Sequence, residues 1–276
     1  MILSASNSFR RLPVVSGRRL AAALLGMLAL AILAPTAPAG AATPLYPDLR
    51  MPSPTDLHLT LWPVASGAEH YQLRFETKPS NYGRGALEVD RVPTPSGIAD
   101  LTQRIYEEPA GFRDEVLGSV VFAPLDTLFP VPDLARYELW THRHFVRAQK
   151  RNFRRGQPLH VTDNIGHCIR DDEPIDPDTP HVEGESGTYH FCTKLVSGIS
   201  AGWRSTQSWG DDGQYIDFGL TPLPDGDYVL RAIVDPYNLL WESDGKGDPA
   251  REGEVANSGV TYFRVIDGAL VGMEEL

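Results

Sequence analysis

Alternation of apolar and polar residues marks two short segments in the first third of the chain. Between residues 57 and 62, leucines at every second position alternate with His58 and Thr60. Between residues 71 and 77, aromatic or leucine side chains alternate with polar ones in the same way. Because successive side chains of a strand point to opposite faces, each segment is predicted to form a half-buried β-strand.

A more apolar pattern occupies residues 198–235, which read GISAGWRSTQSWGDDGQYIDFGLTPLPDGDYVLRAIVD. Residues 227–235 carry mostly apolar side chains on both faces, which is typical of a well-buried strand. A shorter strand is predicted at residues 214–220, and the Pro-Asp-Gly sequence at residues 224–226 is predicted to form the turn between the two. The Gly-Asp-Asp-Gly sequence at residues 210–213 predicts a further turn.

After residue 42, no segment has a sustained 3.6-residue apolar repeat, so the pattern predicts no amphipathic helix. The 25 glycines and 23 prolines are spread evenly along the chain. Short strands between many turn residues are typical of all-β sandwiches. Residues 43–276 are therefore predicted to form a single all-β domain, a β-sandwich with long irregular loops.

The first 42 residues are predicted to be a secretory signal peptide and not part of the fold. Residues 20–33 form an apolar run, and alanines at positions 37, 39 and 41 follow it in the manner of a cleavage site. The run of about 14 residues is shorter than the ~20 that cross a bilayer, which argues against a membrane anchor. Four arginines precede the run: Arg10, Arg11, Arg18 and Arg19. The last two stand directly before it, which leaves a twin-arginine signal open beside the general secretory one.

The net charge of the chain indicates which classes of binding partner are favoured. The formal charge of the whole chain at pH 7 is −11. Since the signal segment holds four arginines and no acidic residue, the remaining chain carries −15. An acidic surface argues against nucleic acid and anionic membranes as partners. An acidic surface is compatible with a basic partner, such as a basic protein or a polyamine. The alternative is that the negative charge only keeps the protein soluble. No membrane span is predicted in the mature chain.

The chain has two cysteines, Cys168 and Cys192. The signal segment predicts a secreted, extracellular or cell-envelope location, which is oxidising, so one disulfide between the two cysteines is predicted. On the loop-entropy estimate such a bond stabilises the fold by roughly 3 kcal/mol. Two reactive thiols are the alternative.

Two separated signatures resemble the lysyl oxidase family of copper and quinone amine oxidases. Residues 101–139 read LTQRIYEEPAGFRDEVLGSVVFAPLDTLFPVPDLARYEL, where bacterial lysyl oxidase homologues have TQRIY and GGFRD, then a histidine cluster and FARYEL. The run from residue 198 resembles the family's GIS-GW, YG, GQWIDI and LPDG segments. The resemblance runs from about residue 47 to residue 265. It implies a lysyl-oxidase-type β-sandwich and, for the family, copper- and quinone-dependent oxidative deamination of peptidyl lysine.

The resemblance implies a copper site that this chain lacks the residues to build. The family binds Cu(II) through imidazoles in a segment that reads F-H-P-x-H-x-H-F-H, where alternate positions bring the rings to one face. The segment aligns without gaps from residue 122, and its four histidine positions carry other residues: Ala123, Asp126, Leu128 and Pro130. Alanine, leucine and proline side chains cannot bind a metal, and one carboxylate at Asp126 is not a copper site.

The resemblance also implies a quinone cofactor made from a tyrosine cross-linked to a lysine. The tyrosine position is Trp209, and an indole cannot form that quinone. The lysine is expected just before a strand near residues 157–162, where the chain has Gly156, Gln157 and Pro158. No cofactor is therefore expected. Copper and lysine tyrosylquinone are expected only if the family chemistry survives.

Other residues offer substitutes for the lost copper ligands. His142 and His144 are predicted to project from the same face of a strand, and a His-x-His pair can hold a metal. A third ligand would have to come from elsewhere: His160, His167 or Asp126. The alternative is a pair of half-exposed strand histidines without a metal.

Two further features have a chemical and a plain interpretation. Trp203 and Trp209 are candidates for a tryptophan-derived quinone, as in unrelated amine dehydrogenases, or are two packed aromatics. The acidic run inside the predicted disulfide loop is a candidate calcium site, but its spacing matches no EF-hand and its prolines favour an extended, solvated loop. Its carboxylates are Asp171, Asp172, Glu173, Asp176 and Asp178.

The leading functional hypothesis is a secreted, catalytically degenerate homologue of the lysyl oxidases, which keeps the scaffold while the chemistry is lost. The first alternative is an active copper amine oxidase with relocated ligands such as His142 and His144. The second alternative is an extracellular or envelope binding or structural protein whose acidic surface meets basic partners.

Overall fold

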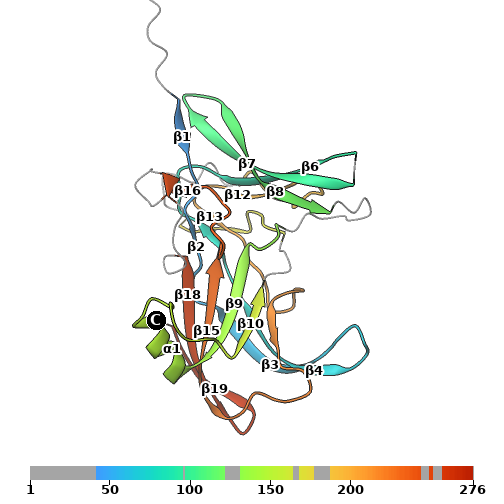
Figure 1. The fold of residues 1–276 in the computed structure, drawn as a ribbon, viewed down its shortest axis with the longest axis vertical. Coiled ribbons are helices and arrows are strands. Elements are labelled where there is room, and N and C mark those ends of the chain that lie inside the picture. The colour runs from blue at the N-terminus through green and yellow to red at the C-terminus, as the bar shows by residue number, and fades with distance from the viewer. Residues whose placement is uncertain are drawn as a thin grey trace, which may run out of the picture. The chain divides into compact units, whose positions relative to one another are not determined.

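The computed structural model describes residues 42–95, 97–121, 131–163, 168–176, 187–243, 249–250 and 257–275. Over these residues the protein is mostly β, with several antiparallel sheets and one short helix (Figure 1). Several predictions fall outside the described residues. These are the signal segment apart from Ala42, the four positions that the resemblance assigns to copper ligands (Ala123, Asp126, Leu128 and Pro130), His167 and Asp178.

The helix α1 (His142–Gln149) lies between β9 and β10 in the chain. The described strands are β1 (Thr43–Leu45), β2 (Leu49–Arg50), β3 (Thr55–Pro63), β4 (Glu69–Glu76), β5 (Ser80–Asn81), β6 (Leu87–Pro93), β7 (Ile98–Glu108), β8 (Phe112–Val121), β9 (Ala135–Thr141), β10 (His160–Asp163), β11 (Glu173–Pro174), β12 (Val196–Ile199), β13 (Trp203–Arg204), β14 (Tyr215–Asp217), β15 (Gly226–Val234), β16 (Glu242–Ser243), β17 (Pro249–Ala250), β18 (Ser258–Ile266) and β19 (Ala269–Glu275).

The strands pair into antiparallel sheets of different size. One five-stranded sheet has the order β1-β7-β6-β12, with β8 also paired to β7, and a second has the order β10-β9-β15-β18-β19. A four-stranded sheet has the order β11-β13-β5-β2, a three-stranded sheet has the order β14-β4-β3, and β16 pairs with β17.

The strand predicted at residues 227–235 is confirmed as β15, which lies between β9 and β18 in the second five-stranded sheet. Every residue from Tyr228 to Val234 is buried. A central strand that is covered on both faces has no solvent side, and this is why its apolar residues do not alternate with polar ones.

The strand predicted at residues 214–220 is shorter than expected. It comprises β14 alone, which pairs with β4 and belongs to a different sheet from β15. Gly219 has a φ of 67°, a left-handed conformation that ends the extended backbone and is easily reached by glycine. The segment at residues 224–226 therefore connects two sheets.

The two segments predicted from alternation do form strands, β3 and β4, which pair with each other. The prediction that both are half-buried is wrong for β4, because Gln72 and Arg74 on its polar face are each only 1% exposed. Leu73 and Phe75 of β4 have no exposed surface. The ring of Tyr137, from β9, meets the ring of Phe75 edge-on, with centroids 4.8 Å apart. The hydrophobic core therefore includes the contact between the three-stranded sheet and the second five-stranded sheet.

The prediction that the chain has no helix is wrong for residues 142–149, which form α1. The Oγ1 atom of Thr141 caps its first turn by accepting a hydrogen bond of 3.4 Å from the backbone N–H of His144. Phe145 and Ala148 are its buried residues. Two apolar positions are too few to produce a repeat in the sequence. Across the described part of the chain, no helix is long and apolar enough to cross a membrane.

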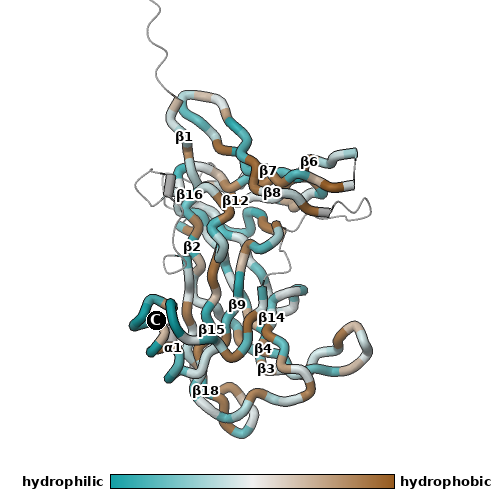
Figure 2. Tube along the Cα trace, in the orientation of Figure 1, coloured by the Kyte–Doolittle hydropathy of each residue, from teal (hydrophilic) through white to brown (hydrophobic). Residues whose placement is uncertain are grey.

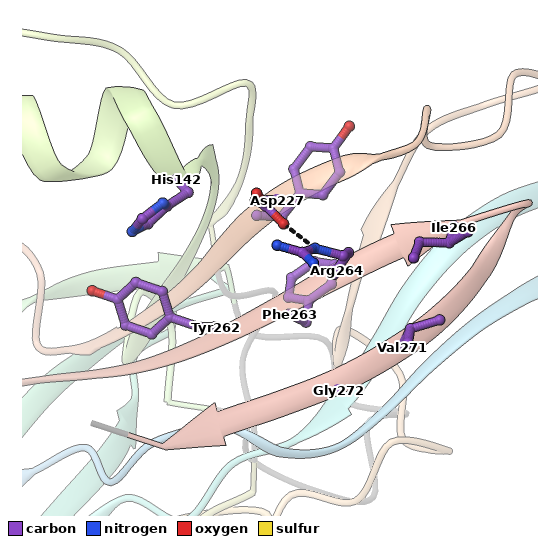
Figure 3. Close-up of a pocket in the computed structure, with 9 residues that line it drawn as sticks. His142, Asp227, Tyr262, Phe263, Arg264, Ile266, Val271 and Gly272 are labelled. Atoms are coloured by element: carbon purple, nitrogen blue, oxygen red, sulfur yellow. Dashed lines mark hydrogen bonds and ion pairs between the residues drawn. The ribbon is translucent and has the colours of Figure 1, made fainter.

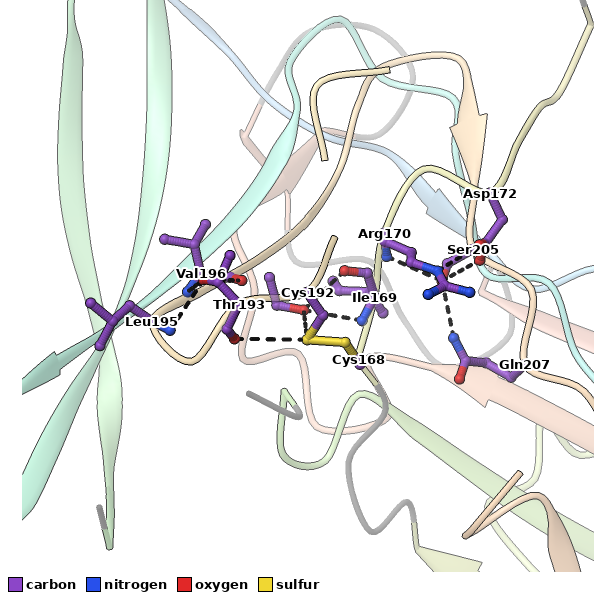
Figure 4. The surroundings of a disulfide bond; sticks show 11 residues. Cys168, Ile169, Arg170, Asp172, Cys192, Thr193, Leu195, Val196, Ser205 and Gln207 are labelled. Atoms are coloured by element: carbon purple, nitrogen blue, oxygen red, sulfur yellow. Dashed lines mark hydrogen bonds and ion pairs between the residues drawn. A yellow bond between two sulfur atoms is a disulfide. The ribbon is translucent and has the colours of Figure 1, made fainter. Parts of the chain in front are cut away.

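The predicted disulfide is present (Figure 4). The S–S bond between Cys168 and Cys192 is 2.02 Å long, and neither cysteine is a free thiol. Beside it, the Ser197 hydroxyl accepts a hydrogen bond from the backbone N–H of Ile169 and donates one to its carbonyl oxygen, each at 3.0 Å. The bond therefore fastens the residue 168 segment close to β12.

Candidate functional site

The loop that carries Trp209 folds over the outer face of the three-stranded sheet β14-β4-β3. Residues opposite each other in an antiparallel pair share a face, and Arg74 of β4 lies opposite both His58 of β3 and Tyr215 of β14. We call this surface the Trp209 face. Its residues are His58, Trp62, His70, Gln72, Arg74, Trp209, Tyr215 and Asp217.

Arg74 is the buried centre of the Trp209 face, with 1% of its surface exposed. Its guanidinium donates hydrogen bonds to the backbone carbonyl oxygens of Trp209 (2.6 Å) and Asp211 (2.7 Å), and to the side-chain oxygen of Gln72 (2.9 Å). Burial lowers the pKa of Arg74, while the charges of Tyr215 and the two loop aspartates act in the opposite direction. The guanidinium therefore holds the Trp209 loop onto the sheet.

Aromatic rings surround this guanidinium. Its central carbon lies 3.9 Å from the centre of the Trp62 ring and 5.1 Å from that of the Tyr215 ring, which are cation–π distances. The ring of Trp209 lies 4.5 Å from that of His58 and meets the Trp62 ring edge-on at 6.1 Å. The indole at the position that the resemblance assigns to the quinone tyrosine is therefore packed between other side chains.

A histidine–carboxylate pair lies next to this packing. His70 Nδ1 is 2.9 Å from Asp217, which also accepts hydrogen bonds from Gln72 (3.3 Å) and the backbone N–H of Gly219 (2.6 Å). Burial opposes ionisation of Asp217, but these donors outweigh it and hold the pKa of Asp217 below its usual range. Within the described residues no serine, threonine or cysteine hydrogen-bonds to His70.

A buried network of hydrogen bonds anchors the loop that carries Trp209. The Tyr137 hydroxyl donates to the side-chain oxygen of Gln214, whose amide nitrogen donates to the Thr77 hydroxyl at 2.7 Å and to the backbone carbonyl of Gln207 at 3.3 Å. Gln207 and Gln214 lie on either side of the Trp209 loop. Both ends of the loop are therefore tied to β9 and to the residue after β4.

His142 and His144 do not form the predicted pair, because they lie on a helix and not on a strand. Residues two apart on a helix are rotated by roughly 200° about its axis, so they face opposite ways. His142 lines an open groove of about 520 Å³ beside Tyr262 and the Asp227–Arg264 ion pair (Figure 3). His144 lines a different hollow. A shared copper site at these two residues is therefore not supported.

The acidic run is solvated only in part: Asp172 and Asp176 are exposed, as its prolines favoured, whereas Asp171 is buried. Asp171 is 7% exposed, and its carboxylate accepts hydrogen bonds from the backbone N–H of Tyr189 (2.8 Å) and from the Ser200 backbone N–H and hydroxyl (2.7 Å each). Asp172 and Glu173 are held by other protein groups. In the described ranges, no group of three or more His, Cys, Asp or Glu side chains is placed to hold a metal ion.

The remaining candidates are also separated. Trp203 is 6% exposed in the main hydrophobic core, whereas the rings beside Trp209 are those of His58 and Trp62, so the two tryptophans pack in different places. The strand predicted at residues 157–162 begins only at His160. The segment that the resemblance assigns to the cofactor lysine, at Gly156, Gln157 and Pro158, precedes that strand.

Sequence reasoning missed Arg74 and the His70–Asp217 pair. The alternation in β4 places Gln72 and Arg74 on its polar face, which is normally solvated. The loop at residues 209–211, whose backbone carbonyls accept hydrogen bonds from Arg74, covers that side chain and buries it. The available signal was a polar strand face together with two tryptophans, Trp62 on the neighbouring strand β3 and Trp209 on a distant loop.

Comparison with protein-family models and with curated proteins gives no match for this chain.

Proposed function

We propose that the chain is an exported protein of the lysyl oxidase type in which the amine-oxidase chemistry is lost and which acts by binding. The observation that carries the proposal is the packing of Trp209. Its indole lies against His58 and Trp62, and its backbone carbonyl accepts the hydrogen bond from buried Arg74.

The residues do not fit a copper–quinone centre. A tyrosine-derived quinone needs a phenol, a partner lysine and copper, and the chain has an indole at residue 209 and no lysine at residues 156–158. At the four copper positions, Ala123, Leu128 and Pro130 have no donor atom in their side chains, which leaves one carboxylate. Since metal and quinone carry the chemistry together, losing both removes the reaction and leaves the scaffold.

A binding role follows from the scaffold and the charge. The chain without its signal segment carries −15, which favours basic proteins or polyamines as partners for the acidic surface. The signal segment supports a secreted or cell-envelope location, where a disulfide-linked β-rich scaffold persists. An active copper enzyme with relocated ligands has less support, because His142 and His144 face different hollows.

The proposal is tested with exported protein collected from copper-supplemented medium. Copper content is measured by mass spectrometry, and hydrogen peroxide release is measured with benzylamine and with a lysine-rich peptide. We expect copper far below one per chain, no peroxide and no quinone absorbance. Copper-dependent oxidation of either amine by the unmodified protein would sink the proposal.

Two variants sharpen this test. Trp209→Tyr restores the phenol alone, and we expect it to stay inactive because the copper and lysine positions are still replaced. Activity in that variant would mean that the rest of the machinery is intact, against the proposal. His142→Ala/His144→Ala should leave the copper content unchanged, whereas loss of near-stoichiometric copper would reveal a relocated site.

A further inference from the structure

A dense group of positive charges stands out on this acidic chain. Residues 142–155 read HRHFVRAQKRNFRR and hold six cationic side chains and no acidic one, while the whole chain carries −11. They belong to α1 and to the turn after it, a hydrophilic part of the chain (Figure 2). We call these six residues the basic patch: Arg143, Arg147, Lys150, Arg151, Arg154 and Arg155.

The charges of the basic patch are exposed and uncompensated. All six side chains belong to exposed residues. None of them forms an ion pair with any residue that the structure describes. Elsewhere, arginines pair with carboxylates even at the surface, as Arg84 does with Glu108 at 3.0 Å and Arg113 with Glu107 at 2.7 Å. Clustered like charges repel one another, so the patch gains stability from an external anion.

The basic patch is held rigidly on an apolar foundation. Phe145 and Ala148 of α1 pack with Trp140 and Val229 in a second hydrophobic cluster. After the helix, the ring of Phe153 covers the guanidinium of buried Arg231, whose central carbon is 3.9 Å from the ring centre. The helix and the following turn are thus anchored by apolar contacts, while the six cationic residues are exposed.

Backbone geometry gathers the arginines into one hollow. Asn152 and Phe153 have positive φ angles of 49° and 55°, which reverse the chain after the helix. The residues after this reversal share with α1 a hollow of about 650 Å³. Its polar lining consists of His144, Arg147, Arg151, Arg154, Arg155 and Gln157. Four guanidinium groups therefore border a single concave surface.

The chemistry of this lining selects the partner. Guanidinium groups bind phosphate oxygens through paired hydrogen bonds, and four of them match a ligand with several closely spaced anionic groups better than one phosphate ion. Among its lining residues the hollow has no Phe, Tyr or Trp ring on which a nucleotide base could stack, its one aromatic ring being the imidazole of His144, and it has no exposed apolar side chain to enter a bilayer. The net negative charge of the chain is an average and does not describe this local surface.

We propose that the basic patch binds a linear polyanion built of repeated phosphate groups that is not a nucleic acid. This polyanion lies in the hollow between α1 and the segment from Arg154 to Gln157. Its phosphate groups pair with the four arginines of the hollow. None of these residues belongs to the Trp209 face, so the inference stands whether or not the amine-oxidase chemistry is lost.

The test measures binding of a defined-length inorganic polyphosphate to the exported protein at near-physiological salt. The patch variant is Arg147→Gln/Arg151→Gln/Arg154→Gln/Arg155→Gln. The control variant removes four exposed arginines elsewhere: Arg50→Gln/Arg84→Gln/Arg170→Gln/Arg264→Gln. Both variants lose the same charge, and thermal melting with circular dichroism checks that each is folded.

We expect the patch variant to bind roughly 100-fold more weakly and with a shallower dependence on salt, because it has lost four phosphate contacts. The control variant should stay within about 3-fold of the unmodified protein, since only the general charge has changed. Undetectable binding by the unmodified protein, or equal weakening in both variants, would overturn the proposal.

Three further comparisons separate the sources of anionic charge. Tighter binding to single-stranded DNA of equal charge would mean that bases are recognised, and it would overturn the proposal. So would salt-sensitive binding to anionic phospholipid vesicles that polyphosphate does not compete away. Salt-sensitive self-association that the patch variant abolishes, and that polyphosphate leaves intact, would assign the patch to a second copy of the acidic chain instead.

Discussion

Arg74 donates a hydrogen bond of 2.6 Å from its Nε atom to the backbone carbonyl oxygen of Trp209, across 135 positions of sequence. The bond joins the middle of β4 to the loop before β14. Because the same guanidinium stacks on Trp62, its position depends on the sheet as well as on the loop. The middle of the outer face of the three-stranded sheet, at Gln72 and Arg74, is for this reason buried.

Replacement of Arg74 by methionine should therefore loosen the Trp209 loop. Methionine keeps much of the apolar volume but loses the hydrogen bonds and both cation–π contacts, so we expect a loss of about 2–3 kcal/mol in the free energy of unfolding. Urea unfolding measures it. Arg50→Met is the control, since Arg50 also stacks on a ring, that of Tyr82 at 4.7 Å, but is exposed. Equal losses in both variants would contradict a special role for Arg74.

The buried ion pair between Glu138 and Arg231 supports the basic patch through Phe153. Arg231 and Glu138 are exposed by only 1% and 6%, and their charged groups are 3.3 Å apart. Glu138→Ala removes a buried carboxylate that pairs with this buried guanidinium, so we expect a loss of about 3–5 kcal/mol. Glu108→Ala removes a carboxylate from an exposed pair, and we expect a change of at most about 1 kcal/mol. Denaturant unfolding measures the loss for each variant. Similar losses of unfolding free energy in Glu138→Ala and Glu108→Ala would contradict the expectation that burial makes the first pair costlier to break.

Tyr137 should make the fold sensitive to alkaline pH. Burial raises the pKa of its phenol above the ordinary value of 10.0, although hydrogen bonds with Thr77 and Gln214 act in the opposite direction. Below about pH 10 the phenol of Tyr137 is protonated in both the folded and the unfolded protein. Above about pH 10 the unfolded protein loses this proton first. Its contribution to stability is therefore present below about pH 10 and is lost as pH rises further, by at most about 1.4 kcal/mol per pH unit.

The variant Tyr137→Phe isolates this contribution. It should start from a lower stability at neutral pH, because two hydrogen-bond partners are left without the hydroxyl. Between about pH 9 and 11 its free energy of unfolding should then fall less steeply with pH than that of the unmodified protein. The difference between the two slopes should correspond to the release of about one proton on unfolding. Parallel pH profiles from urea titrations would refute the assignment.

The Cys168–Cys192 disulfide should stabilise the fold by limiting the unfolded chain. The bond closes a loop with a sequence separation of 24, for which we expect about 3 kcal/mol. Cys168→Ser/Cys192→Ser should lose this amount and become insensitive to reductant. Reduction of the unmodified protein with dithiothreitol should produce the same loss. A double variant as stable as the oxidised protein would show that the link constrains nothing.

Local patterns in the sequence were sufficient for several elements. Alternation identified β3 and β4, and an apolar run identified β15. Each depends only on neighbouring side chains, because the two faces of a strand are defined by its own backbone. The disulfide was equally accessible, since a chain with two cysteines allows one internal pairing.

Short elements escaped the same reasoning. The helix α1 buries only Phe145 and Ala148, so no repeat develops, and the alternating His142 and His144 were assigned to a strand. The N-cap Thr141 was the one local signal for a helix. This error matters for function, because it turned two histidines on opposite sides of a helix into a potential metal pair.

By itself, the sequence determined the positions of β3, β4 and β15 and the single disulfide. Only the tertiary structure decided that Arg74 is buried under the Trp209 loop and that Arg147, Arg151, Arg154 and Arg155 share one hollow. The physical reason is the range of the interactions. Strand alternation is set between adjacent residues, whereas the environment of a charge depends on which distant segments cover it or leave it open to water.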